Sequence, residues 1–235
     1  MDQQIAHSLT VGRRGSQRSR TDARDLLETL REDIVSMRLK PGTVLSRQEL
    51  QDRFGLSSTP VRDCLLRLQE AGLVDIFPQH ATLVSRIDLD QARQAQFLRR
   101  SLETECVRQL CASRPPELVE RLERLIRQQT ALAEIGEIDQ FTAADQAFHL
   151  ALFEANNVGD LWHLIRSRSG HIDRLRRLHL PVKGKIAEIL IAHRAIVDAI
   201  AANDGPAADA ALRGHLSRSL VFSATLKEQN PDYFR

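Results

Sequence analysis

The chain has 235 residues, 27% of them charged, and a formal net charge of +2 at pH 7. This length suits two domains better than one. Leu, Ala and Ile are abundant while only 4% of residues are aromatic, a balance that favours packed helices. Because the net charge is small, any attraction for nucleic acid has to come from local arrangement. Neither a run of about 18 apolar residues nor a signal-peptide core is present, which argues against a membrane or exported protein.

The three cysteines, Cys64, Cys106 and Cys111, are an odd number and lack the spacing of a zinc site. Such a set is typical of a reducing compartment, and we therefore expect a cytoplasmic protein. We interpret Cys64 as a small packing residue and not as a redox switch.

Residues 1–20 are polar and predominantly basic. They contain Arg13, Arg14, Arg18 and Arg20 but only one acidic residue, Asp2. We predict a flexible basic tail over this range. The alternative is a basic arm that adds phosphate contacts to a nucleic-acid interface.

A first helix is predicted over residues 21–37, where Leu26, Leu30 and Ile34 recur at helical spacing. It is ended by the turn sequence Lys40-Pro41-Gly42. This helix precedes the most informative part of the chain.

Two short helices joined by a tight turn are predicted over residues 46–54 and 59–71. Gly55 lies where a sharp turn between helices favours a left-handed residue. Thr59 is a suitable N-cap for the second helix, and Pro60 suits its first helical position. Hydroxyl groups and arginines at the exposed start of such a helix can enter the major groove of DNA.

The second of these helices is amphipathic, because its apolar residues recur on one side and leave Arg62 and Arg67 pointing outward. Arg62 is the expected base contact, since arginine can grip guanine in a bidentate manner. Arg67, one turn further on, is expected at the DNA backbone or in solvent. Four side chains at the starts of the two short helices are expected to meet phosphate: Arg47, Gln48, Ser58 and Thr59.

A small hairpin is predicted after Gly72, from the apolar segments 73–77 and 81–85. His80 at its tip could reach the minor groove. Helix, helix-turn-helix and hairpin in this order describe a winged helix, so residues 21–86 are predicted to form a DNA-binding domain.

The rest of the chain reads as long helices. They are predicted over residues 88–113, 115–134, 138–156, 159–180, 185–203 and 206–228. Each has apolar residues three and four apart, as at Leu98 and Leu102. We expect an antiparallel bundle of six to seven helices over 87–229, followed by a C-terminal tail at 230–235. The predicted fold class is thus mainly α, a winged helix-turn-helix followed by a helical bundle.

Asp145 and His149 lie four residues apart, so on a helix both project from one face, about 6 Å apart along the axis. His193 and His215 belong to two successive predicted helices, whose antiparallel packing can bring them level. Three imidazoles and one carboxylate would suit Zn, Ni, Mn or Fe, with open positions for a ligand. On spacing alone, scattered histidines are more often surface or core residues, and that alternative stays open.

Two groups of residues carry a resemblance to a known family. The first runs Leu30-Arg31, Ile34, Leu39-Lys40-Pro41-Gly42-Thr43-Val44-Leu45, Leu50, Gly55-Leu56-Ser57, Thr59-Pro60-Val61-Arg62, Leu65, Leu68 and Gly72-Leu73. The second comprises Arg99, Leu102-Glu103, Asp145, Phe148-His149, His193-Arg194, Ala199-Ile200 and His215. The chain resembles the GntR superfamily of bacterial transcription regulators, in the FadR-like branch with an FCD ligand-binding domain. It departs from many relatives at Ser58, where they have arginine, and at the hairpin tip Gln79-His80-Ala81-Thr82, which lacks their glycine.

The resemblance implies a metabolite-responsive repressor that binds a near-palindromic double-stranded DNA operator as a homodimer. It implies that the aspartate and the three histidines together form one site for a divalent transition metal ion, with zinc the first choice. A small organic acid effector would take an open coordination position, with Arg99 as its second anchor. The alternative for Arg99 is an ion pair with Glu103 on the helix surface.

Two other classes of function stay open on the sequence. A metal-dependent enzyme would use the aspartate and histidines catalytically, but no HExxH-type motif or paired glutamate names a reaction. An architectural DNA-binding protein would use its helical domain only to dimerise. We expect no enzymatic activity, and DNA binding controlled by an effector.

Overall fold

The computed structural model describes residues 23–113 and 115–235 of the chain. The described residues form two compact units, one up to Arg86 and one from Ile87 to Arg235. The predicted basic tail, residues 1–20, lies outside the described residues. Within the described part, no helix is long and apolar enough to cross a membrane.

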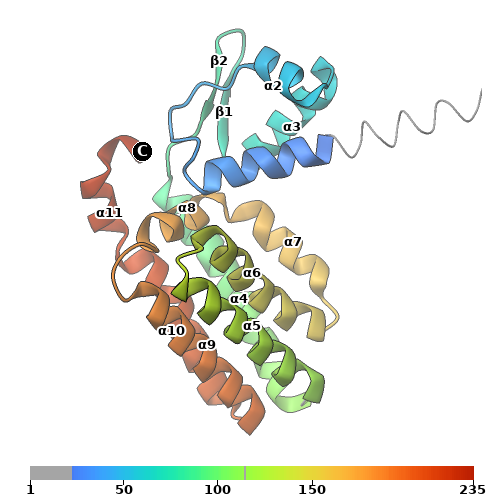
Figure 1. Cartoon of the computed structure of the whole chain (residues 1–235), viewed down its shortest axis with the longest axis vertical. Coiled ribbons are helices and arrows are strands. Elements are labelled where there is room, and N and C mark those ends of the chain that lie inside the picture. The colour runs from blue at the N-terminus through green and yellow to red at the C-terminus, as the bar shows by residue number, and fades with distance from the viewer. Residues whose placement is uncertain (1–22, 114) are drawn as a thin grey trace, which may run out of the picture. The chain divides into compact units, whose positions relative to one another are not determined.

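The first unit is a winged helix-turn-helix, as predicted. It consists of a helix over residues 23–35, α2 (Arg47–Phe54), α3 (Ser58–Glu70), β1 (Val74–Phe77) and β2 (Ala81–Val84) (Figure 1). Its apolar core includes Leu26, Leu30, Ile34, Leu50, Val61, Leu65, Leu68, Leu73, Val74 and Val84. Because this set draws on every helix and both strands, the helical spacing seen in the sequence marks the side by which each helix packs.

Local features determine both ends of α2. Ser46 caps α2, and its Oγ accepts a hydrogen bond from the Glu49 N–H over 3.3 Å. Gly55 ends α2 at φ 64°, the left-handed conformation that the sequence predicts there.

The N-cap of α3 lies two residues before the predicted one. Ser57 is the N-cap and the helix begins at Ser58, so Thr59 and Pro60 lie inside its first turn. The prediction of Thr59 as the cap was therefore wrong. Proline is tolerated at this place because the first N–H groups of a helix have no acceptor within it.

The hairpin forms the wing. Its strands are antiparallel, with Val74 paired to Val84 and Phe77 to Ala81. Gln79 makes the turn at φ 62°, a conformation that glycine adopts at lower cost.

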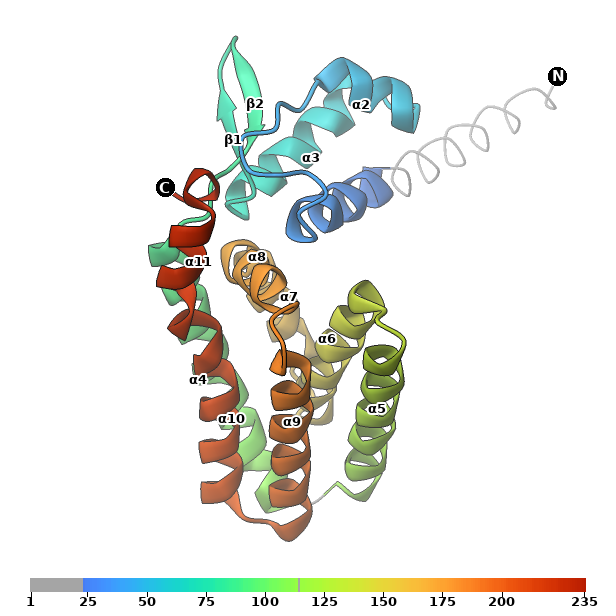
Figure 2. The same cartoon turned by 60° about the vertical axis from the view of Figure 1, so that its left-hand side comes forward.

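The second unit is built mainly of helices. Its helices are α4 (Leu89–Ser113), α5 (Pro116–Glu134), α6 (Ile138–Ala155), α7 (Gly159–Arg168), α8 (Gly170–His179), α9 (Lys185–Ala202), α10 (Gly205–Val221) and α11 (Ser223–Gln229). Figure 2 shows α4, α10, α9 and α5 as neighbouring long helices. The main core includes Val107, Leu110, Leu122, Phe148, Leu152, Ile196, Ile200 and Leu212.

Two of the predicted helical segments are each divided in the structure. The segment 159–180 breaks at Ser169 into α7 and α8, and the segment 206–228 breaks at Phe222 into α10 and α11. A serine hydroxyl donates to the carbonyl three residues earlier at both breaks, from Ser169 over 3.1 Å and from Ser223 over 2.7 Å.

The last six residues, expected as a tail, pack against the start of the helical unit. Pro231–Tyr233 form a 3-10 turn, and Phe234 pairs with Ile87 in a parallel β-bridge. The Ile87 N–H donates to the carbonyl of Tyr233 over 2.7 Å. Phe234 is only 3% exposed and belongs to an apolar cluster with Ile87 and Leu175. These residues are thus part of the folded unit.

Candidate DNA-binding surface and metal centre

The exposed side of α3 carries the residues predicted to contact DNA. Ser58, Thr59, Arg62 and Arg67 are all exposed, on the side away from the buried apolar residues Val61, Leu65 and Leu68 of the same helix. The Ser57 side chain does not cap the helix, so the first backbone N–H groups of α3 remain available to an external acceptor. Hydroxyls, free backbone donors and arginines are therefore presented together, as DNA contact requires.

The other predicted contacts lie on α2 and on the wing. Arg47 and Gln48 are exposed at the start of α2, and His80 is exposed at the β1–β2 turn. Gln48 differs from the prediction in one respect, because its amide donates to Asp52 over 2.9 Å.

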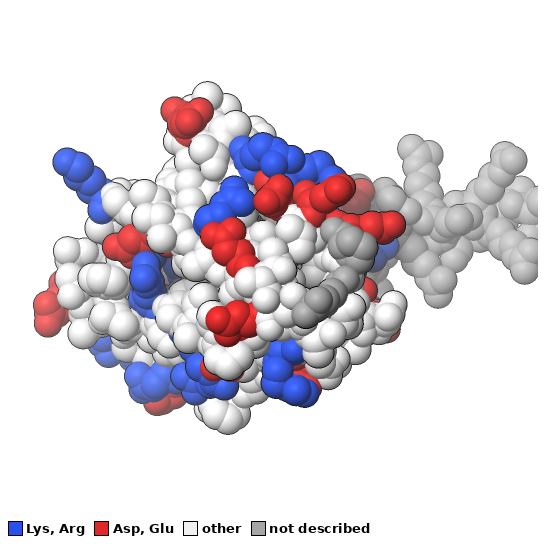
Figure 3. All heavy atoms as spheres, turned by 90° about the horizontal axis from the view of Figure 1, so that it is seen from below, with Lys and Arg blue, Asp and Glu red and all other residues white. Residues whose placement is uncertain are grey.

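On the face of the molecule shown in Figure 3, Lys and Arg side chains lie beside Asp and Glu side chains without a region of one sign. This agrees with the small net charge.

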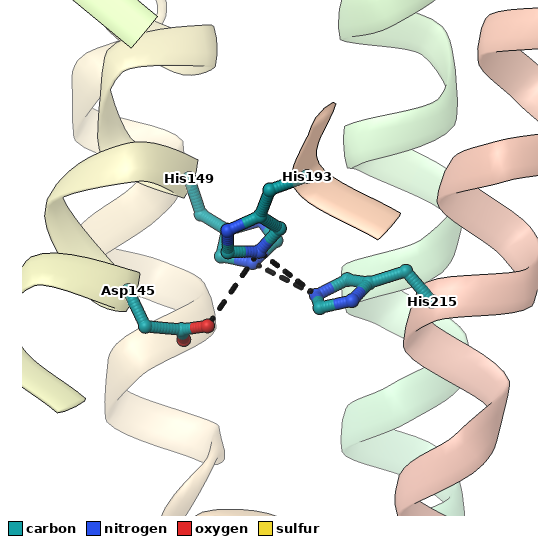
Figure 4. A group of neighbouring side chains, drawn as sticks. All are labelled: Asp145, His149, His193 and His215. Atoms are coloured by element: carbon teal, nitrogen blue, oxygen red, sulfur yellow. Dashed lines mark hydrogen bonds and ion pairs between the residues drawn. The ribbon is translucent and has the colours of Figure 1, made fainter. Parts of the chain in front are cut away.

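The four predicted metal ligands converge within the helical unit (Figure 4). Asp145 and His149 project from one face of α6, His193 comes from α9 and His215 from α10. Each offers one donor atom, and these atoms all lie within 4.8 Å of one another. All four side chains are buried, His215 being the most exposed at 8%. The histidines are thus neither scattered nor on the surface.

Neighbouring side chains determine which nitrogen of two imidazoles carries the proton. Nδ1 of His149 lies 2.6 Å from a carboxylate oxygen of Glu103, so it must donate. Nδ1 of His193 lies 2.8 Å from Oε1 of Gln129 and donates as well. Both Nε2 atoms therefore present lone pairs, and they point at Nε2 of His215 over 3.2 Å and 3.3 Å.

The cluster has too few protons for its acceptors. His215 can supply at most one Nε2–H to the two facing lone pairs of His149 and His193. Oδ1 of Asp145 is buried, lies 3.6 Å from Nε2 of His193, and has no hydrogen-bond partner in the described structure. A buried group of acceptors that cannot satisfy one another is the environment that a cation stabilises.

The spacing of the donors also fits a metal ion. Ligand atoms held about 2.0–2.2 Å from a tetrahedral ion lie about 3.4 Å apart. Three of the six separations between these atoms, 3.2, 3.3 and 3.6 Å, bracket that value, and all six are within 4.8 Å. The donor set of three imidazole nitrogens and one carboxylate oxygen suits Zn²⁺ and other divalent transition ions.

Electrostatics keep the donors in the protonation states that a metal requires. Burial lowers the pKa of all three histidines, for His193 to about 3, so the imidazoles are neutral. Burial alone would raise the pKa of Asp145, but the Arg176 guanidinium holds it well below its ordinary range. Nη2 of Arg176 lies 2.5 Å from Oδ2 of Asp145 and leaves Oδ1 facing the cluster.

Arg99, the predicted effector anchor, lies on α4 and is 6% exposed. The alternative ion pair with Glu103 exists, with Nε 2.5 Å from the carboxylate, but it is buried and not on the surface. Nη2 of Arg99 is buried without a hydrogen-bond partner in the described structure. The guanidinium also lies 5.6 Å from the ring centroid of Trp162. One donor group of Arg99 is thus available to an additional acceptor.

Sequence reasoning missed three polar residues that contact the metal-ligand candidates: Glu103, Gln129 and Arg176. Glu103 was noted only as a partner of Arg99, and its contact with His149 spans 46 positions of the chain. Gln129 and Arg176 had no local signal, because each meets its partner from another helix. The one sequence feature that could have indicated them is a polar residue at a helical position where the spacing predicts an apolar residue.

The two units correspond to two known families. Residues 23–84 match the bacterial regulatory proteins of the gntR family, and residues 94–218 match the FCD domain. GntR regulators bind DNA operators, and FCD domains bind small-molecule effectors. The fold and these matches define the class, a DNA-binding transcription regulator. The chain belongs to the GntR family of bacterial regulators and carries an FCD domain.

Individual relatives agree with this assignment. The chain is 35% identical over 216 residues to an uncharacterized HTH-type transcriptional regulator in an unstable DNA locus of Streptomyces ambofaciens, covering 92% of this chain and 90% of the relative. It is 30% identical over 205 residues to the HTH-type transcriptional repressor RspR of Escherichia coli K12, covering 87% and 90%. The structure of E. coli McbR/YncC has the same fold, with a TM-score of 0.73 at 22% identity over 88% of this chain and 98% of that one.

The family assignment overturns one alternative. Because the family and the relatives are transcription regulators, the chain is not a metal-dependent enzyme.

Proposed function

We propose that this regulator is a repressor whose helical domain binds one divalent transition metal ion and a small carboxylate effector. Asp145, His149, His193 and His215 would hold the ion, with zinc the first choice among Zn, Ni, Mn and Fe. The observation that carries the proposal is the convergence of four buried ligand atoms with too few protons to satisfy one another. A bound ion would act as a Lewis acid toward an anionic ligand.

The effector site is proposed beside these donors. Arg99 has a buried donor group without a partner, and it is linked to His149 through Glu103. A carboxylate matches a planar guanidinium and also suits an open coordination position on a metal ion. A small organic acid is therefore the proposed class of effector.

The DNA contacts are proposed for the exposed residues of α2, α3 and the wing. Arg62 would read a base in the major groove, while Arg67 would meet the backbone. The set proposed to contact phosphate or the minor groove is Arg47, Gln48, Ser58, Thr59 and His80. Two winged helices in a homodimer would bind the two halves of a near-palindromic operator.

The repressor assignment draws support from RspR, a repressor by name, with which the chain shares 30% identity. Regulation follows from linkage between two sites. An effector that binds more tightly to one placement of the winged helices shifts the chain toward that placement and so changes operator affinity. The operator must then change effector affinity by the same factor. We propose that effector binding releases the operator.

The test combines three measurements on the purified full chain. Elemental analysis is expected to find about one transition metal ion per chain. A thermal-shift screen of small organic acids is expected to show a rise in Tm that disappears after treatment with a chelator. The acids that raise Tm should weaken binding to the promoter DNA of the chain's own gene in a gel-shift assay. DNA binding without metal and without any acid response would instead support an architectural DNA-binding protein.

A further inference from the structure

Two buried polar side chains lie behind the imidazoles of the four-donor cluster. Glu103 of α4 contacts Nδ1 of His149 over 2.6 Å, and Gln129 of α5 contacts Nδ1 of His193 over 2.8 Å. All four of these residues are 0% exposed. Each contact lies on the side of the ring opposite to the nitrogen that faces the cluster.

The orientation of each supporting group is itself fixed by a second hydrogen bond. The Gln129 amide nitrogen donates to the carbonyl of Ala144 over 3.1 Å, so its oxygen must face His193. The other carboxylate oxygen of Glu103 accepts from Nε of Arg99 over 2.5 Å. Neither group can turn away from its imidazole without losing a buried bond, which costs about 1–3 kcal/mol.

We propose that Glu103 and Gln129 are positioning residues of the metal centre, each fixing the tautomer and the ring direction of one histidine ligand. This inference rests on the proposed metal site. An imidazole whose Nδ1–H is held by an acceptor keeps its Nε2 lone pair aimed at the ion and becomes a more basic ligand. Without the acceptor, the ring can rotate or exchange tautomers, and both lower the affinity for the ion.

The two positioning residues act with different strength. A carboxylate forms a charge-assisted hydrogen bond, which is shorter and about twice as strong as one to a neutral amide. The distances of 2.6 Å for Glu103 and 2.8 Å for Gln129 follow that order. Nδ1 of His215 has no hydrogen-bond partner among the described residues. His149 is therefore the most firmly held of the three imidazoles and His215 the least.

Fold stability does not by itself account for these polar groups. Apolar residues of similar size often replace a buried ion pair at no cost in stability. The buried carboxylate of Glu103 contacts the guanidinium of Arg99 on one side and the imidazole of His149 on the other. Orientation of His149 for metal binding accounts for this arrangement.

The experiment measures Zn²⁺ affinity of the full chain by competition with a chromophoric chelator, at one pH. Gln129→Leu removes the acceptor of His193 and is expected to weaken Zn²⁺ binding about 10–100-fold. Glu103→Gln replaces the charge-assisted bond to His149 by a neutral one and is expected to weaken it by a smaller factor, about 10-fold. Gln129→Glu retains an acceptor for Nδ1 of His193 but loses the bond to Ala144, so it is expected to bind Zn²⁺ more tightly than Gln129→Leu. Thr104→Val is the matched control, since Thr104 is a buried neighbour on α4 whose hydroxyl has no partner in the described structure. It should leave affinity unchanged.

If Glu103 and Gln129 only stabilised the fold, their replacement would not alter the geometry of the metal ligands. A spectroscopic measurement and a double variant distinguish these two roles. The visible spectrum of bound Co²⁺ should change in Glu103→Gln and Gln129→Leu but not in Thr104→Val, because only the first two alter ligand geometry. Glu103→Gln also leaves Arg99 without an anionic partner, so the double variant Arg99→Met/Glu103→Gln keeps the charges balanced and should bind Zn²⁺ as weakly as the single variant.

The outcomes distinguish this inference from the proposed function. If the wild type binds Zn²⁺ tightly while Glu103→Gln, Gln129→Leu and the double variant all bind it equally well, the positioning role is wrong and the metal site stands. If the wild type binds neither Zn²⁺ nor Co²⁺, the metal site itself is wrong, and the positioning role falls with it.

Discussion

Arg176 of α8 and Asp145 of α6 form an ion pair in which the aspartate is buried and the arginine half-buried, with Nη2 of the arginine 2.5 Å from Oδ2 of the aspartate. The pair fixes the carboxylate so that only Oδ1 faces the three imidazoles. Burial opposes the charged state of the Arg176 guanidinium, but Asp145 raises its pKa above the ordinary value. α8 is thereby tied to the donor cluster through a side chain that is not itself a donor.

Replacing Arg176 by methionine is expected to destabilise the fold by about 3 kcal/mol, because the Asp145 carboxylate would stay buried without its partner. The measurement is denaturant unfolding at neutral pH. Arg177→Met is the matched control: its ion pair with Asp139 is 2.7 Å long but partly exposed, so about 0–1 kcal/mol is expected. Equal losses in the two variants would contradict the assigned difference between a buried and an exposed pair.

Replacing Arg62 by alanine is expected to weaken specific operator binding by about 1–3 kcal/mol and to relax base preference at one position. Arg67→Ala should instead weaken binding evenly across sequences and reduce the salt dependence by about one phosphate contact. Gel shifts at several salt concentrations, on DNA selected from a random duplex library, measure both effects. Unchanged selectivity in Arg62→Ala would remove that residue from the base contacts.

The winged helix was accessible from the sequence because its signals are local. Gly55 and the apolar spacing of Val61, Leu65 and Leu68 each act within a few residues, and the structure has the turn and the buried side that they predict. The cap of α3 was misplaced because two serines and a threonine stand in a row, and any of them suits an N-cap.

Gly55→Ala is expected to cost about 1–2 kcal/mol, because a side chain at φ 64° meets its own backbone. An added Cβ at Gly55 would meet no other atom within 4 Å, so the cost is conformational. Gly214→Ala is the contrasting variant: Gly214 lies within α10, also with no atom within 4 Å, and has no positive φ. It should gain about 0.5–1 kcal/mol. Thermal unfolding of both variants checks the opposite signs.

Phe234→Ala is expected to destabilise the helical unit by about 3 kcal/mol, since it removes a side chain that is 3% exposed in an apolar cluster. Arg235→Ala is its control, because the Arg235 ion pair with Asp88 is partly exposed and worth less than about 1 kcal/mol. Denaturant unfolding compares the two. If Phe234→Ala lost no more stability than Arg235→Ala, the last residues would behave as the tail that the sequence predicts.

The metal-ligand candidates could be chosen from the sequence only with the help of the family resemblance. The spacing of Asp145 and His149 placed two donors on one helix face, but no local pattern connects them to His193 and His215. The supporting contacts from Glu103 and Gln129 were invisible, because they depend on how α4 and α5 pack against their neighbours. Long-range packing decides such contacts, and a single sequence carries no direct record of it.

Acid sensitivity is expected from His171, a residue of α8 that is 1% exposed and lies outside the donor cluster. Its Nδ1 accepts hydrogen bonds from the Asp88 N–H over 3.1 Å and from the Arg174 guanidinium over 2.9 Å. Burial, together with Arg174 and Arg235, lowers the pKa of His171 to about 3, although Asp88 opposes the shift. A proton on Nδ1 would remove both hydrogen bonds and place a charge beside a buried guanidinium.

The lowered pKa of His171 fixes the direction of the pH effect. Unfolding raises the pKa to about 6.5, so the unfolded chain takes up a proton that the folded chain refuses between about pH 6.5 and 3. The neutral imidazole contributes its full stability above pH 6.5, and about 3 kcal/mol of it is lost by pH 4. His171→Asn retains an acceptor without a titrating ring and should flatten this loss, whereas the exposed His163→Asn should not. Denaturant unfolding at pH 7, 5.5 and 4 measures the slopes, and an unchanged slope in His171→Asn would assign the acid loss to other groups.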